Sequence, residues 1–289
     1  MNKKVLKAAV IMAVFITLIL GFVFSVYYGY FHINGLIAGK YPVRGVDVSH
    51  YQGEIDWQVL SGQDIQFAYI KATEGSSHTD ERFSFNCEKA RGAGLTTGAY
   101  HFFSFDSPGS AQAQHFIRTV EPFEGMLAPA VDVEFYGDKK ENPPIPALVE
   151  AELKDFLDQV EQAYGRKPVI YATKEAWELY IRGRFDDYPL WIRDIWQKPV
   201  LKSEAADGKE YNWTFWQYTN RGRLKGFSGE ETFVDLNVFY GTWEEWLQSL
   251  ASQNRETLHL RPDPSQKLSS VKKTSQSPPP PHHGHYPFP

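Results

Sequence analysis

Short apolar runs alternate with segments of helical pattern between about residues 41 and 250, and this alternation limits the possible fold more than any other feature of the sequence. Because strands that alternate with helices build βαβ units, the pattern predicts a parallel sheet. Eight strands in one domain of this size favour a closed, TIM-like α/β barrel. The segments around the last three strands are too short for full helices, so we expect fewer helices than strands. The predicted strands are Arg44–His50, Phe67–Thr73, Thr97–Phe103, Ala128–Phe135, Pro168–Ala172, Leu190–Arg193, Thr214–Tyr218 and Phe233–Phe239, and the predicted helices are Asp80–Ala93, Ser110–Val120, Ile145–Tyr164, Lys174–Ile181 and Thr242–Leu250.

The N-terminal segment predicts a transmembrane helix. After a basic stub (1–7), residues 8–31 run for 24 positions without a charge, and about 20 apolar residues suffice to span a bilayer as a helix. A secretory signal has an apolar region of only about 7–15 residues followed by small residues, whereas this run ends in Val26-Tyr-Tyr-Gly-Tyr30. We therefore favour an uncleaved anchor over a cleaved signal that would release the protein. The lysines of the stub place the N-terminus in the cytoplasm by the positive-inside rule, so the rest of this single-pass chain lies outside it.

The remaining sequence divides into a linker (32–43), the barrel domain (44–250) and a Pro-rich tail (251–289), which its composition predicts to be disordered. Residues 41–251 carry 21 basic and 33 acidic residues. Such an acidic domain argues against nucleic acid as a partner, because binding to nucleic acid depends on neutralising phosphates. The single cysteine, Cys87, excludes an intramolecular disulfide and a multi-cysteine zinc site.

Polar residues gather at the predicted strand ends, where β/α barrels place their active sites. The sharpest pattern is Val131-Asp132-Val133-Glu134. Side chains alternate along a strand, so both carboxylates face one side, roughly 6–7 Å apart, and the valines face the other. The other strand-end residues are Asp47, Ser49, His50, Lys71, Glu74, Tyr100, His101, Tyr171, Trp191, Arg193, Trp216, Gln217, Tyr218, Asp235 and Asn237.

Four of these acids, Asp47, Asp132, Glu134 and Asp235, lie in or directly after apolar strands. Burial and mutual repulsion raise carboxyl pKa values, so one of these acids can stay protonated near neutral pH and act as a general acid. Two alternatives remain open. The acids can be structural partners of neighbouring groups, or they can bind Mg²⁺ or Ca²⁺, although no calcium-loop spacing is present.

Aromatic residues near the same predicted mouth favour a sugar ligand. Flat aromatic faces pack on pyranose rings, and the polar tips of Tyr, Trp and His form hydrogen bonds. The candidates for substrate binding are Tyr100, Tyr171, Trp191, Trp216, His50 and Tyr218. We expect Trp57, Trp177, Trp243 and Trp246 to have packing roles.

Taken together, these motifs resemble glycoside hydrolase family 25, the Chalaropsis-type lysozymes. They occur in family order over about residues 44–243. The matching segments are Gly45-Val-Asp-Val-Ser-His-Tyr-Gln-Gly53, Ile55-Asp-Trp57, Phe67-Ala-Tyr-Ile-Lys-Ala-Thr-Glu-Gly75, Ala93-Gly-Leu95, Gly98-Ala-Tyr-His-Phe102, Pro129-Ala-Val-Asp-Val-Glu134, Val169-Ile-Tyr171, Leu190-Trp-Ile192, Phe215-Trp-Gln-Tyr218 and Val234-Asp-Leu-Asn237.

The resemblance implies an incomplete β/α barrel that hydrolyses the β-1,4 bond between N-acetylmuramic acid and N-acetylglucosamine in peptidoglycan, without a cofactor or metal. It implies that Glu134 is the general acid/base and that Asp132 is its partner, with Asp47 and Asp235 in support. Tyr100, Tyr171, Trp191 and Trp216 are implied to line the site. We expect a retaining reaction assisted by the substrate's acetamido group, in a monomer that remodels or turns over the cell wall.

The chain departs from the family pattern at Arg193, where the family usually has a small residue after Leu-Trp-Ile. The anchor and the tail also lie outside the family domain, and we find no wall-binding repeats. Two rival functions remain open at this point: a membrane-tethered, non-catalytic glycan-binding protein, and a hydrolase of another N-acetylated glycan such as chitin.

Overall fold

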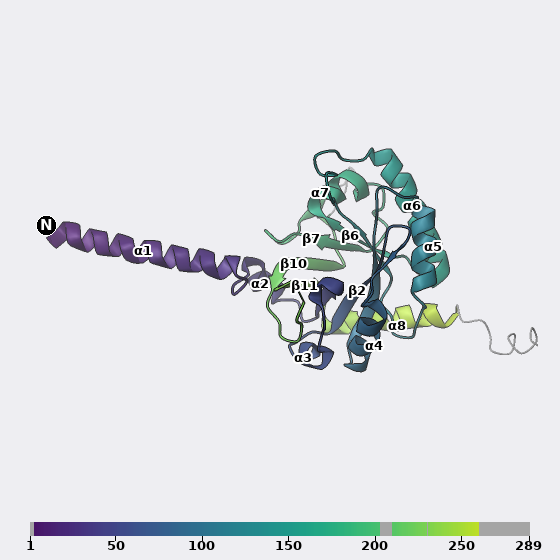
Figure 1. Ribbon diagram of the computed structural model, residues 1–289, viewed down its shortest axis with the longest axis horizontal. Coiled ribbons are helices and arrows are strands. Elements are labelled where there is room, and N and C mark those ends of the chain that lie inside the picture. The colour runs from purple at the N-terminus through teal and green to yellow at the C-terminus, as the bar shows by residue number, and fades with distance from the viewer. Residues whose placement is uncertain (1–2, 203–209, 230, 260–289) are drawn as a thin grey trace, which may run out of the picture.

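The eight predicted strands form one closed barrel in the computed structural model, which describes residues 3–202, 210–229 and 231–259 (Figure 1). Around the barrel the strand order is β1-β11-β10-β7-β6-β5-β4-β2, and β1 pairs with β2 to close it. The predicted fold class is therefore confirmed. The barrel strands are β1 (Arg44–Val48), β2 (Phe67–Glu74), β4 (Thr96–Phe102), β5 (Ala130–Val133), β6 (Val169–Thr173), β7 (Leu190–Arg193), β10 (Phe215–Gly222) and β11 (Val234–Phe239). Three short strands lie outside this ring: β3 (His78–Thr79) pairs with β2, and β8 (Leu201–Lys202) pairs with β9 (Glu210–Tyr211).

The sheet is not wholly parallel, and on this point the prediction from alternation was wrong. Strand β11 runs antiparallel to both β1 and β10, whereas the other barrel pairings are parallel. A parallel return needs a crossover of a dozen or more residues, usually a helix, and the segment between Gly222 and Val234 is shorter than that. The N-terminal end of β11 therefore meets the C-terminal ends of the other strands.

The helical ring is incomplete, as the sequence predicted. Among the described residues no helix lies between β7 and β10 or between β10 and β11. The predicted helix Lys174–Ile181 consists of α7 (Lys174–Ala176) followed by a π-helical turn (Trp177–Ile181), and a 3₁₀ turn (His50–Gln52) follows β1. The helices around the barrel are α3 (Trp57–Ser61), α4 (Phe83–Gly92), α5 (Gly109–Thr119), α6 (Pro146–Tyr164) and α8 (Trp243–His259).

Helix α8 covers one end of the barrel. Its Trp246 packs against Phe67 and Phe239, with ring centroids 5.5 and 5.2 Å apart, so this end is apolar and filled. The helix continues past Leu250, where the sequence pattern had placed the start of the tail. The rest of that predicted tail, residues 260–289, lies outside the described residues. We call this filled, apolar end the floor of the barrel. The inward-facing polar side chains gather at the opposite end.

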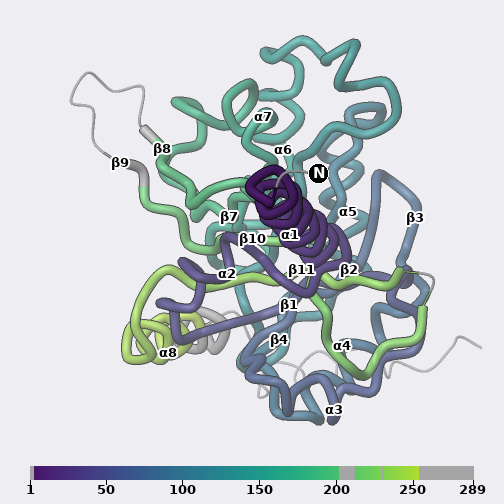
Figure 2. Tube along the Cα trace, turned by 90° about the vertical axis from the view of Figure 1, so that its left-hand side faces the viewer, coloured from purple at the N-terminus to yellow at the C-terminus, as the bar shows by residue number. Residues whose placement is uncertain are grey.

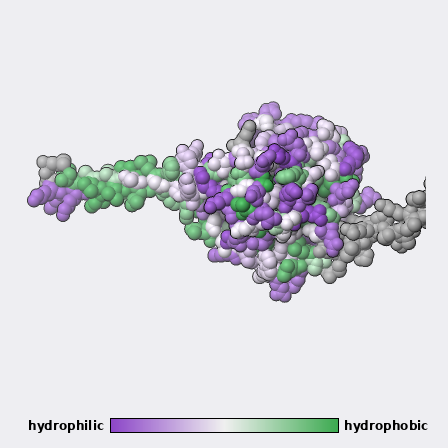
Figure 3. Space-filling view, turned by 60° about the horizontal axis from the view of Figure 1, so that its bottom comes forward, coloured by the Kyte–Doolittle hydropathy of each residue, from purple (hydrophilic) through white to green (hydrophobic). Residues whose placement is uncertain are grey.

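The N-terminal run forms α1 (Lys3–Tyr27), which is long and apolar enough to cross a membrane, although a signal sequence would pass the same test. It projects away from the barrel, and its surface is mainly apolar, unlike that of the domain (Figures 1 and 3). Gly29 follows with φ 68°, a conformation that other residues rarely adopt. A short helix, α2 (Ile33–Ala38), then leads into β1.

Candidate active site

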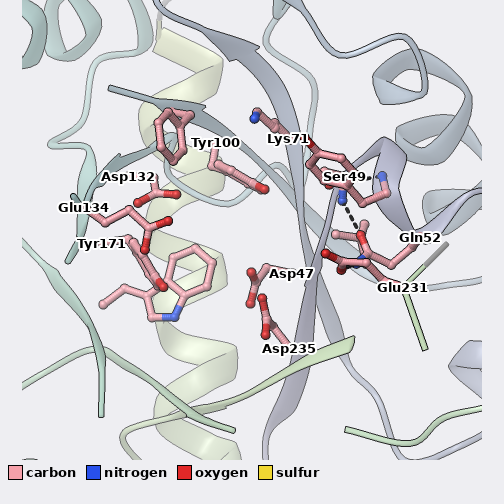
Figure 4. A pocket seen from close by; sticks show the side chains of 14 residues that line it. Asp47, Ser49, Gln52, Lys71, Tyr100, Asp132, Glu134, Tyr171, Glu231 and Asp235 are labelled. Carbon is pink, nitrogen blue, oxygen red and sulfur yellow. Dashed lines mark hydrogen bonds between the residues drawn. The ribbon is translucent and has the colours of Figure 1, made fainter. Parts of the chain in front are cut away.

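A cavity of about 180 Å³ opens at the C-terminal ends of the parallel strands. The carboxylates of Asp47, Asp132, Glu134 and Asp235 point into this cavity. In Figure 4, Asp132 lies beside Glu134 and Asp47 lies beside Asp235. All four acids predicted from the sequence are thus brought together. The other residues around the cavity are Val48, Ser49, Tyr51, Gln52, Lys71, Tyr100, Phe102, Tyr171, Trp191 and Glu231.

Strand β5 positions the first pair of acids. Val131 and Val133 are fully buried in the layer outside the barrel, so Asp132 and Glu134 face inward. Burial raises the pKa of Asp132 well above its ordinary value, and the charges of Glu134 and Asp47 add to the effect. Burial also raises the pKa of Glu134, against the opposing influence of the Arg193 charge. Oδ1 of Asp132 is buried without a hydrogen-bond partner.

The second pair comes from the first and last barrel strands. Asp47 of β1 and Asp235 of β11 are directly opposite in the antiparallel register, so their side chains are neighbours. Burial raises the pKa of both acids. The pKa of Asp235 is raised well above its ordinary value, and the Asp47 charge is the second cause after burial. The hydrogen bond between the two lowers the pKa of Asp47 and raises that of Asp235.

Two side-chain amides hold the Asp47 carboxylate. Gln217 donates to both of its oxygens, at 3.2 and 3.0 Å, and Asn237 donates to Oδ2 at 2.6 Å. These amides are oriented in turn by Tyr171, whose hydroxyl donates to Gln217 at 3.1 Å, and by Trp191, whose indole N–H donates to Asn237 at 2.8 Å. The network favours the ionised form of Asp47, because amide N–H groups stabilise negative charge.

The aromatic candidates divide into two groups. Tyr100, Tyr171 and Trp191 line the cavity, and Tyr100 directs its hydroxyl toward the centre (Figure 4). Burial raises the pKa of both tyrosines well above the ordinary value, with nearby carboxylates adding to it, so both phenols stay neutral. A neutral phenol can donate a hydrogen bond to a sugar oxygen.

The structure does not bring Trp216, Tyr218 and His50 to the cavity. Because Phe215 and Gln217 face inward, the side chains of Trp216 and Tyr218 alternate to the outer layer, where Trp216 is fully buried and donates to the Asp194 carbonyl at 2.8 Å. His50 begins the 3₁₀ turn after β1, and its Nδ1 lies 2.8 Å from Asp80. These three residues do not line this cavity, and their contact with a ligand stays a prediction.

Several cavity residues were not assigned to a site from the sequence. Lys71 lies 2.6 Å from Glu74 and over the Phe102 ring at 4.9 Å, and its position at a strand end was the available signal. Gln52 donates to Glu231 at 2.5 Å. No strand-end pattern marks Gln52 or Glu231, because Gln52 lies in the 3₁₀ turn after β1 and Glu231 in the loop before β11. Within the described part of the chain, no group of three or more His, Cys, Asp or Glu side chains is arranged to hold a metal ion.

The family model described as glycosyl hydrolases family 25 matches residues 46–227. The chain belongs to this family. A solved structure of a family 25 glycosyl hydrolase from Bacillus anthracis is 48% identical with a TM-score of 0.66, and the match covers 72% of this chain and 94% of that one. Lysozyme M1 of Streptomyces globisporus is 34% identical over 220 residues, 69% of this chain and 68% of that protein. The uncharacterized protein YegX of Escherichia coli K12 is 35% identical over 239 residues, 80% of this chain and 82% of that one.

Family membership confirms the resemblance and makes this protein a glycoside hydrolase. Two further cavities adjoin the first and share Glu134 with it. Arg193, at the end of β7, lines both of these. In this family 25 hydrolase the cavities therefore meet at Glu134, and the cations Lys71 and Arg193 both act on the carboxylates.

The raised carboxyl pKa values predict the pH dependence of stability. A carboxyl whose pKa is higher in the folded state binds more protons there, so its contribution to stability is present at low pH and is lost as pH rises through the folded pKa. We expect Asp132→Asn to stabilise the domain at neutral pH by at least about 1 kcal/mol, since each pKa unit corresponds to about 1.4 kcal/mol. Urea unfolding between pH 4 and pH 8 measures this difference.

Asp187→Asn is the control of opposite sign. A hydrogen bond from Lys167 lowers the pKa of this exposed carboxyl, so the substitution should cost a little stability at neutral pH and nothing at low pH. Equal pH profiles for wild type and Asp132→Asn would contradict the description of the buried pair.

Proposed function

We propose that this hydrolase cleaves the β-1,4 bond between N-acetylmuramic acid and N-acetylglucosamine in peptidoglycan, with Glu134 as general acid and base. The observation that carries the proposal is the inward-facing pair Asp132 and Glu134, both with raised pKa, in a groove lined by neutral tyrosines. Relatives named lysozyme M1 and N,O-diacetylmuramidase support the choice of bond. Local remodelling or turnover of the cell wall is the corresponding role.

In the proposed mechanism, Glu134 starts protonated and donates to the leaving glycosidic oxygen. Positive charge then develops on the sugar ring, and the substrate's own acetamido oxygen attacks the anomeric carbon. Asp132 accepts a hydrogen bond from the acetamido N–H and orients this group, a role that suits its unpartnered Oδ1. Water, activated by the now ionised Glu134, opens this intermediate. Burial raises the pKa values of the pair, and the Asp47 charge adds to the effect.

This double displacement retains the configuration at the anomeric carbon. Retaining carboxyl pairs are typically about 5–5.5 Å apart and inverting pairs about 6.5–9.5 Å, and the i, i+2 spacing on one strand lies near the boundary. The expectation of retention therefore rests on participation of the acetamido group and not on the distance between the two carboxyl groups. We expect proton NMR to detect the β-anomer first during hydrolysis, and an early α-anomer would contradict retention.

Glu134→Gln removes the proton donor but keeps the shape of the side chain. We expect activity on purified peptidoglycan to fall by about 10²–10⁴-fold, the usual contribution of general acid–base catalysis. Mass spectrometry of the soluble products, after chemical reduction of the new ends, measures the loss. Glu121→Gln, an exposed change before β5, is the matched control and should leave activity intact.

The same products test the bond specificity. Ends of reduced N-acetylmuramic acid support the proposal, whereas reduced N-acetylglucosamine ends would keep the catalytic acid and overturn the choice of bond. Efficient cleavage of chitin oligomers in place of peptidoglycan would overturn the substrate.

Arg193 is proposed to tune the catalytic acid. Its charge lowers the pKa of Glu134, and Glu134 must be protonated for the first step. The alkaline limb of kcat/KM therefore reflects this pKa. We expect Arg193→Ala to move the alkaline limb to higher pH, because the opposing positive charge is gone. Arg193→Lys keeps a positive charge and should keep the limb near its original position, and an unchanged limb in Arg193→Ala would contradict the assignment.

We also propose that α1 stays attached as a membrane anchor, with the catalytic domain outside the cytoplasm. Support comes from contacts between the end of α1 and the barrel. Arg221 donates to the Tyr27 carbonyl, and Arg223 donates to the Tyr28 carbonyl at 2.5 Å. Cleavage within 27–30 would remove groups that the folded domain binds.

A further inference from the structure

Helix α1 joins the barrel at the same end as the catalytic cavity. Arg221, at the C-terminal end of β10, packs its guanidinium over Tyr27 at 4.8 Å, and Arg223 packs over Tyr30 at 4.4 Å. Figure 2 looks along α1, which projects in front of the barrel, and its C-terminal end meets the barrel at β10. Since the carboxylates lie at this end of the strands, the site and the membrane helix share one face of the domain.

The junction is fixed to the barrel. Asn34 is almost fully buried, and its side-chain amide donates to the carbonyls of Asp194 and Tyr218, both at 3.2 Å. His32 contacts the Thr219 hydroxyl at 3.1 Å. These contacts tie α2 to the ends of β7 and β10. Residues 28–32 alone separate α1 from α2, so the expected linker gives the domain little freedom to turn away from the bilayer.

Aromatic side chains mark where the bilayer surface meets the domain. Tyr27, Tyr28 and Tyr30 are exposed at the end of α1, and Tyr and Trp favour the interface between lipid and water. Trp196, in the loop after β7, is 85% exposed. With Phe22, Val23 and other residues it lines a cavity of about 430 Å³ between α1 and the barrel rim. A tryptophan that is exposed beside an apolar transmembrane helix gains a suitable environment in the headgroup layer.

The catalytic groove adjoins this membrane-facing rim. Asn220 and Arg221 line both the cavity beside α1 and the part of the groove that contains Glu134. Charge favours the same orientation, because the domain is acidic whereas Arg221 and Arg223 place cations at the rim. An anionic bilayer surface would attract these two arginines at the rim.

We propose that the catalytic mouth faces the bilayer and that the preferred substrate is a glycan strand attached to lipid in the same membrane, cut close to its lipid end. The proposal rests on the proposed muramidase activity and on the retention of α1. It makes the short junction a specificity element, because the junction holds the groove against the membrane surface.

The test uses the full-length protein in vesicles of phosphatidylethanolamine and phosphatidylglycerol. Two forms of one wall glycan are compared: soluble chains, and chains attached through the reducing end to a lipid of the same vesicles. The first variant carries a 20-residue Gly/Ser insertion between Phe31 and His32. We expect its rate on attached relative to soluble glycan to fall about tenfold, because effective concentration falls with tether length. We also expect the fragments left on the lipid to become longer.

Trp196→Glu is the second variant, and Trp196→Phe is its matched control. The exposed position makes a folding defect from either change small. Glutamate should weaken contact with the anionic bilayer and lower the same rate ratio, whereas phenylalanine should largely keep it. If the insertion variant loses activity on soluble glycan as well, this pair decides the question.

The outcomes separate the proposals. Unchanged rate ratios and fragment lengths in both the insertion variant and Trp196→Glu would overturn the membrane-facing orientation alone. Failure of the wild type to cut either glycan would overturn the proposed function and this inference with it. Intact-mass measurement of the protein extracted from membranes should include α1, and a mass without it would overturn anchoring and orientation while leaving the muramidase activity standing.

Discussion

Repulsion among four carboxylates in one buried mouth is the constraint on which the site depends. Each acid alone would ionise in water, but together and buried they cannot all carry a charge. The Gln217 and Asn237 amides favour the ionised form of Asp47, while burial and the Asp47 charge raise the pKa of Asp235. Burial favours the protonated state of the pair on β5, and the Asp47 charge adds to this effect. The Arg193 charge opposes it.

The apolar floor makes this concentration of charge tolerable. Trp246 of α8 and the inward-facing Phe67 and Phe239 fill the far end of the barrel, so burial there stabilises the domain without polar groups. Trp191 joins the two regions. Its ring stacks on Tyr69 with centroids 4.8 Å apart, and its N–H donates to Asn237. The packing of the floor thereby orients the amide that holds Asp47.

The sequence patterns predicted those features that depend on one strand alone. Alternation along β5 correctly placed Asp132 and Glu134 on the inner face, and the apolar runs located all eight barrel strands within a few residues. Sequence could not supply strand direction: Asp235 reaches the mouth because β11 is reversed, whereas we had expected a parallel strand. Nor could the sequence show which strand aromatics face the inside of the barrel. Trp191 of β7 faces inward and Trp216 of β10 faces outward, and this difference depends on the register of each strand with its neighbours.

The pairing of β1 with β11 determines when the site can assemble during synthesis of the chain. Asp47 stands near the start of the barrel sequence and Asp235 near its end, 188 positions later by their numbering, yet they face each other across one ladder. The amides Gln217 and Asn237 that hold Asp47 also come from the last two barrel strands. A chain whose last two barrel strands are not yet synthesised lacks all three partners. Synthesis order therefore acts as a safeguard: the carboxylate cluster is complete only after the final strand has closed the barrel.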